Sequence, residues 1–162
     1  MTQQDIIQLI TAALGSLGFS LLYNLRGKKL LIASLGGLIA WSVYLIFRCV
    51  IPDEAIRYLI SSAVITIYAE IFARVLRTPT TTFLVPSVIP LVPGGSLYYS
   101  MNHALNAQWQ PFVTRAFFTL KLALCIAVGI IAITTLTRIA FLITRKIQKQ
   151  VHISYFHPNI RL

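Results

Sequence analysis

The chain has 162 residues, of which 57% are hydrophobic and 11% are charged, and its mean hydropathy is +0.77. Because a soluble domain carries about 25% charged residues, this composition excludes an ordinary soluble fold and predicts an integral membrane protein. The net charge of +10 would indicate nucleic-acid binding in a soluble chain. Here the basic residues lie at the ends of apolar runs, as the positive-inside rule describes, so no nucleic-acid partner is expected.

The first two apolar runs cover residues 6–25 and 30–47, each close to the roughly 20 residues that cross a bilayer. Asp5 precedes the first run and a basic loop at 26–29 follows it. A secretory signal begins with basic residues, so this charge order predicts a retained helix with its N-terminus outside. The first run also carries small residues suited to close helix packing: Gly15, Ser16, Gly18 and Ser20.

The third run, residues 55–76, contains two ionisable residues that a bilayer does not favour. Glu70 and Arg74 are four positions apart, and Arg77 follows three positions later, so all three share one helix face. At 1.5 Å per residue, Glu70 lies roughly 22 Å along the helix, in the third of the membrane nearest the cytoplasm. The two arginines can extend to the inner surface.

The fourth run, residues 82–101, is apolar but interrupted. It contains Pro86, Pro90 and Pro93, each of which removes a backbone donor, and the flexible pair Gly94-Gly95. A continuous helix is therefore not expected. In lipid, irregular backbone is tolerated only inside protein or beside a water-filled cavity, and a broken apolar segment indicates a transporter binding site. The alternative is a kinked helix or a loop near the surface.

The fifth run, residues 112–143, is longer than one crossing needs and must tilt or project from the bilayer. Basic residues gather at its end, as they do after the first and third runs. The sequence therefore predicts an all-α, polytopic membrane helical bundle with five spanning segments, N-out and C-in. The membrane domain covers 1–149, and a tail, 150–162, carries no recognisable signal.

Three short stretches carry a family resemblance: Glu70-Ile-Phe-Ala-Arg74, Arg77-Thr-Pro79 and Val88-Ile-Pro90-Leu-Val-Pro93-Gly94. They resemble the threonine/serine exporter family, and more closely its short members, which match only the C-terminal half. One such type is the small subunit of a two-component bacterial succinate exporter. The resemblance implies ion-driven export of small amino acids or dicarboxylates across the bacterial inner membrane. It also implies a larger membrane partner that supplies the N-terminal half, and it implies no cofactor.

Two charged residues are candidates for the substrate site. Glu70 is suited to bind a substrate ammonium or to carry a coupling proton, because ionisable residues within spans tend to be functional; the alternative is a structural ion pair with Arg74. Lys121, inside the fifth run, is suited to face a substrate carboxylate; the alternative is that it extends to the outer surface.

The interrupted run supplies the other candidates. A helix that restarts there would present backbone N–H groups and a serine hydroxyl to a carboxylate; the alternative is a tight turn. The candidate substrate-binding residues of this stretch are Pro90, Pro93, Gly94, Gly95 and Ser96.

The sequence contains no arrangement that indicates an enzyme or a metal site. Asp53 and Glu54 are adjacent and point apart on a helix, and neither a nucleophile–base set nor a phosphate-binding loop is present. The two cysteines and three histidines lack metal-ligand spacing. Two functions are left: a transport subunit that lines the substrate path, and a non-conducting structural subunit that stabilises a larger partner.

Overall fold

The computed structural model describes residues 2–156, and side chains through residue 143. This part of the chain is entirely helical, which confirms the predicted all-α class. The expected tail, 150–162, begins inside the last helix, and residues 157–162 lie outside the described part. The elements are α1 (Gln3–Leu22), α2 (Lys28–Phe47), α3 (Glu54–Val75), α4 (Thr81–Val88), the 3-10 helix η1 (Ile89–Leu91), α5 (Gly94–Leu105) and α6 (Trp109–Phe156).

Four of the described helices are long and apolar enough to cross a membrane: α1, α2, α3 and residues 109–143 of α6. The expected fourth run is instead divided among α4, η1 and α5. The chain stays helical through Pro86, whereas Pro90 lies in η1 and Pro93 is the residue before α5. Because proline cannot donate to a helix ladder, the helical hydrogen bonds stop near Leu91 and restart at Gly94.

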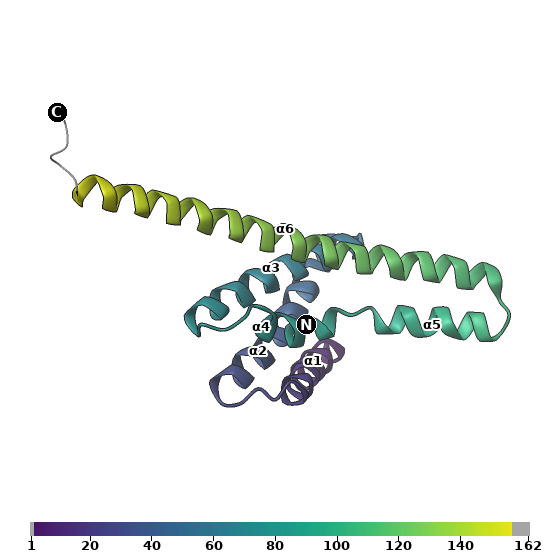
Figure 1. The fold of residues 1–162 in the computed structure, drawn as a ribbon. Helices are drawn as coiled ribbons and strands as arrows, with labels where there is room; N and C mark the ends of the chain where they lie inside the picture. Colours follow the sequence, from purple (N-terminus) through teal and green to yellow (C-terminus); the bar gives the residue numbers. More distant parts are fainter. Residues whose placement is uncertain (1, 157–162) are drawn as a thin grey trace.

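Small residues let the first four helices approach one another closely. α1 packs on α2, and α2 contacts α3 and α4 (Figure 1). The hydroxyl of Ser87 in α4 donates to the carbonyl of Ala33 in α2 at 3.1 Å. A side chain at Gly36 would collide with Ser87. On α1, Gly18 faces open space, so only part of the predicted small-residue face is used within the chain.

The helices α3 and α6 run side by side in the same direction. Lys121 contacts Asp53 at the start of α3, and the Arg74 guanidinium lies 5.5 Å from the Phe141 ring centre near the end of α3. A side chain at Gly129, between these points, would meet the Leu59 carbonyl oxygen at 2.8 Å. We call the two ends of the bundle the Asp53 end and the Glu70 end.

The first part of α6 and all of α5 form a hairpin that projects beyond the bundle (Figure 1). Because Lys121 lies level with the start of α3, residues 109–120 extend about 18 Å past it at 1.5 Å per residue. Helix α5 packs along this extension, and the hydroxyls of Ser96 and Thr119 are 2.8 Å apart at its base. The interrupted segment therefore leads from the bundle into the hairpin.

Candidate functional site

A cavity of about 340 Å³ opens at the Asp53 end, between the helices of the bundle and the start of α5. This volume is at the lower end of the range for ligand pockets, about 300–1,000 Å³. Five of the seven residues predicted for the substrate site line it together: Pro90, Pro93, Gly94, Gly95 and Ser96. The structure thus gathers the candidates from the interrupted run into one wall.

The N-terminus of α5 forms this wall. Pro93 precedes the helix, and no side chain caps it. The first helical hydrogen bond is donated by the Leu97 N–H to the Pro93 carbonyl at 3.0 Å, so the N–H groups of Gly95 and Ser96 come before the ladder begins. A side chain at Gly94 or Gly95 would meet nothing within 4 Å. Bare backbone with partial positive charge therefore faces the cavity.

Aromatic and charged side chains from α2 and α3 form the opposite wall. The Tyr44 hydroxyl donates to Glu54 Oε1 at 3.2 Å, and the Tyr44 ring stacks on Trp41 with centres 4.8 Å apart. Arg48 also lines the cavity and forms a 2.8 Å ion pair with Asp5 of α1, whose side chain is buried. This wall offers both a carboxylate and a guanidinium.

The charged side chains of α1, the α2–α3 region and Lys121 at this end are equal in number of each sign. Asp53 forms a 3.2 Å ion pair with Lys121. The Ala55 N–H, and then Lys121, donate hydrogen bonds that hold the pKa of the Asp53 carboxyl below its usual value, so it stays ionised at neutral pH. Three of the chain's four acidic residues lie here with three basic ones: Asp5, Asp53, Glu54, Arg48, Arg57 and Lys121.

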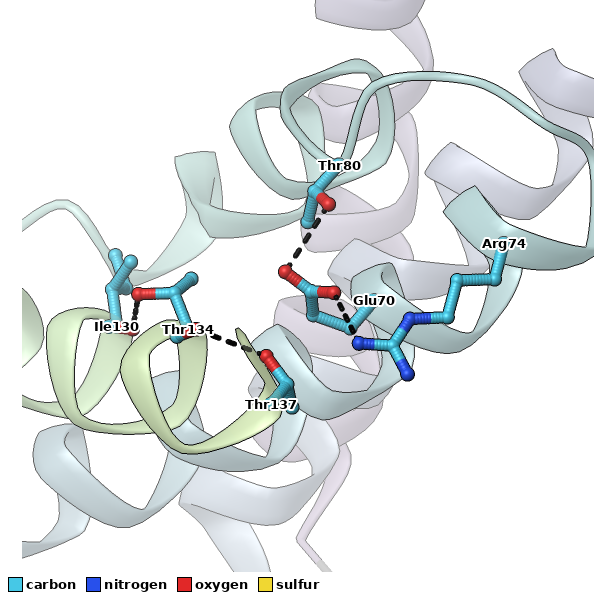
Figure 2. A network of polar contacts seen from close by, with 6 residues as sticks. All are labelled: Glu70, Arg74, Thr80, Ile130, Thr134 and Thr137. Atoms are coloured by element: carbon cyan, nitrogen blue, oxygen red, sulfur yellow. Dashed lines mark hydrogen bonds and ion pairs between the residues drawn. The ribbon is translucent and has the colours of Figure 1, made fainter. Parts of the chain in front are cut away.

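Glu70 and Lys121, the two charged candidates from the sequence, do not line this cavity. Lys121 is occupied by Asp53 beside it. Glu70 lies at the other end of α3, where its carboxylate binds Arg74 and Thr80, each at 3.2 Å (Figure 2). Sixteen residues of helix separate Glu54 from Glu70, about 24 Å.

Sequence reasoning missed the acidic and aromatic wall. No binding role was predicted for Tyr44, and Asp53 and Glu54 were considered as an acid/base pair and rejected because adjacent residues point apart on a helix. One feature of the sequence could have indicated this wall. Three of the four acidic residues lie at ends of apolar runs, and alternating crossings place those ends on the same side of the membrane. Their mutual contact depends on tertiary packing, for example Asp5 with Arg48.

Comparison with known proteins identifies the family. A family model described as "Threonine/Serine exporter, ThrE" matches residues 8–136, which include α1 through most of the described α6. The chain belongs to the threonine/serine exporter family. Searches of curated proteins and of solved structures gave no match.

Membership of the exporter family confirms the predicted resemblance and the expectation of a membrane transport protein. The family is one of exporters rather than enzymes. The matched region also contains the cavity-lining residues of the interrupted segment and those of α2 and α3. The cavity therefore lies within the part of the chain that the family model matches.

Proposed function

We propose that this exporter-family chain is a subunit of a bacterial inner-membrane secondary transporter, and that the cavity at the Asp53 end lies on its substrate path. The substrates are small carboxylate-bearing metabolites, threonine and serine or dicarboxylates such as succinate. In this proposal α4, η1 and the start of α5 provide the broken fourth of five crossings. The observation that carries it is the uncapped α5 N-terminus facing the cavity, because such helix ends bind carboxylates.

The balanced charges favour an amino acid over a dicarboxylate. A dianion entering a site of zero net charge gains less electrostatic stabilisation than one entering a positive site. A zwitterion presents one charge of each sign, and the cavity offers Glu54 on one wall and the α5 N-terminus on the other. We therefore place threonine and serine ahead of succinate.

A double substitution at the break tests the proposal. Because a side chain at Gly94 or Gly95 would enter open space, Gly94→Val with Gly95→Val should leave folding intact and hold a ligand away from the backbone. We expect affinity for threonine to fall about tenfold, the equivalent of one charge-assisted hydrogen bond. Vesicle transport and binding of threonine, serine, succinate and aspartate are the measurements. If the double variant keeps wild-type affinity and transport rate, this stretch does not line the substrate path.

The same double variant distinguishes the proposed transport role from the alternative function, that of a non-conducting structural subunit. A subunit that lines the path loses transport while the complex still assembles. A scaffold that only stabilises a partner loses transport only where assembly is lost with it. Assembly is scored by co-purification of the partner with the double variant and with wild type.

A larger membrane partner is supported by apolar surface that the chain leaves uncovered. On the projecting hairpin, Tyr98, Leu105, Trp109 and Phe117 are each more than half exposed, and such patches mark interaction sites. We expect native mass spectrometry of gently solubilised protein to show this chain bound to a larger membrane subunit. A complex built of this chain alone that is active after reconstitution would contradict an obligate partner.

Orientation is testable with a native cysteine. Cys49 is exposed and directly follows α2, on the side that the loop charges place outside. An impermeant maleimide added to intact cells should label it, and Cys49→Ser should abolish the signal. In that background, Lys28→Cys at the start of α2 should react only after permeabilisation. Labelling of the Lys28→Cys variant in intact cells would show that the proposed orientation is wrong.

A further inference from the structure

Arg57 is a buried cation in contact with Tyr44 of the cavity wall, although Arg57 does not itself line the cavity. It lies one turn into α3 and is only 9% exposed. Its Nε is buried without a hydrogen-bond partner, and none of the ion pairs among the described residues includes it. Burying a charge without a carboxylate partner is strongly unfavourable, so Arg57 is available to a ligand group of opposite charge.

Tyr44 contacts both Arg57 and Glu54, the carboxylate on the cavity wall. The Arg57 guanidinium carbon is 5.0 Å from the centre of the Tyr44 ring, and the hydroxyl of the same ring donates to Glu54 Oε1. Glu54 and Arg57 are three residues apart on one helix, a spacing at which opposite charges normally pair. They do not pair here; the cation lies against the face of the ring and the carboxylate at its hydroxyl end.

We propose that Glu54 and Arg57, kept apart by Tyr44, are the two poles that recognise a zwitterionic substrate. The substrate ammonium takes the place of the Tyr44 hydroxyl at Glu54. The substrate carboxylate meets the N–H groups of Gly95 and Ser96 and, once the Tyr44 ring moves aside, the Arg57 guanidinium. This assignment rests on the proposed transport function and adds the specificity-determining residues to it.

Two observations support it independently. A helix N-terminus alone does not make a ligand site. The second, full charge comes from the buried Arg57 guanidinium, which does not itself line the cavity but lies against the cavity-lining Tyr44 ring. Glu54 and Tyr44 both line the cavity, so an ammonium can reach the carboxylate without unfolding the helix. Binding would then satisfy a cation that the free protein leaves unpaired.

Ligands that each lack one charge provide the test. We would measure binding of L-threonine, L-threoninamide, which lacks the carboxylate, and 3-hydroxybutyrate, which lacks the ammonium. The full-length chain is used in lipid with any subunit that co-purifies. Wild type should bind threonine at least tenfold more tightly than either analogue. Arg57→Gln should lower threonine affinity at least about 30-fold, the effect of removing one partner of a buried charge pair, and leave threoninamide unchanged.

Glu54→Gln should give the opposite pattern, with weaker threonine binding and unchanged 3-hydroxybutyrate binding. Tyr44→Ala removes the spacer, so Glu54 and Arg57 pair and threonine affinity falls, whereas Tyr44→Phe keeps the ring and retains binding. Arg26→Gln, at an exposed arginine outside the cavity, is the matched control and should bind as wild type. If Arg57→Gln does not fold, Arg57→Lys replaces it. Lysine keeps the charge but loses the fork geometry of the guanidinium, so this variant should weaken threonine binding and leave threoninamide binding unchanged.

The outcomes separate the two proposals. If Arg57→Gln binds threonine like wild type, or weakens threonine and threoninamide equally, the recognition proposal is wrong and the transport proposal stands. If wild type binds none of the ligands while the complex transports threonine, this chain does not hold the site and both proposals fall. Selective loss of carboxylate recognition in Arg57→Gln supports the assignment.

Discussion

Replacing Gly37 with valine is expected to disrupt the bundle around the break and abolish transport. A Cβ atom at Gly37 would collide with Ser16 of α1 and lie 3.3 Å from Cγ of Pro90 in η1. Ser16 is fully buried, so it has little room to move. Overpacking of this kind destabilises by about 1–3 kcal/mol, and we expect the upper end because three elements meet at this point.

The consequence for transport follows from Pro90, which also lines the cavity. Pushing α2 away from η1 moves Pro90 and, with it, the start of α5. Thermal unfolding in detergent and threonine uptake into vesicles are the measurements. Gly18→Val is the matched control, because a side chain at Gly18 would enter open space, and it should unfold like wild type. An unchanged unfolding temperature for Gly37→Val would mean that η1 is not held by α2.

The elements of this fold that depend on local chemistry were predictable. Long apolar stretches cross a bilayer whatever their neighbours, and the helices α1, α2 and α3 coincide closely with the first three runs. Proline at 90 and 93 removes backbone donors in any context, and the helical ladder is interrupted there. The arrangement of α4 and η1 depends on packing against α1, α2 and α3, and that of the hairpin on packing of α5 against α6.

Proximity across the chain was not predictable. Glu70 was assigned to the substrate site because ionisable residues within membrane spans tend to be functional. After Glu70, however, the chain finishes α3, turns at Arg77, which has φ 50°, and returns along α4. The break therefore lies at the opposite end of the bundle from Glu70. Glu54, which is farther from the break in sequence, lines the same cavity as the break.

Substitution of Glu70 is expected to slow transport strongly without weakening substrate binding at the cavity. Its two carboxylate oxygens are both used: Oε2 binds Arg74, and Oε1 accepts from the hydroxyl of Thr80, the residue before α4 (Figure 2). Glutamine at position 70 keeps one acceptor oxygen but places its amide N–H group against the donor of either Arg74 or Thr80. Hydrogen bonds to charged groups contribute about 1.5–3 kcal/mol, so a tenfold or greater loss of turnover is expected for Glu70→Gln.

The interpretation depends on how Glu70 and Arg74 act together. If they form only a structural ion pair, removing both charges should relieve the unpaired partner, and the double variant Glu70→Gln, Arg74→Gln should transport at the wild-type rate. We expect instead that the double variant stays slow, because the bond to Thr80 is still altered and a group able to carry a coupling proton is still missing. Thr80→Val, which removes only the hydroxyl, isolates the first of these two effects. Threonine affinity should stay within about twofold of wild type in all three variants, since Tyr58, the nearest cavity-lining residue of α3, lies about 18 Å away along the helix. A large loss of threonine affinity in Glu70→Gln would instead show that Glu70 belongs to the substrate site.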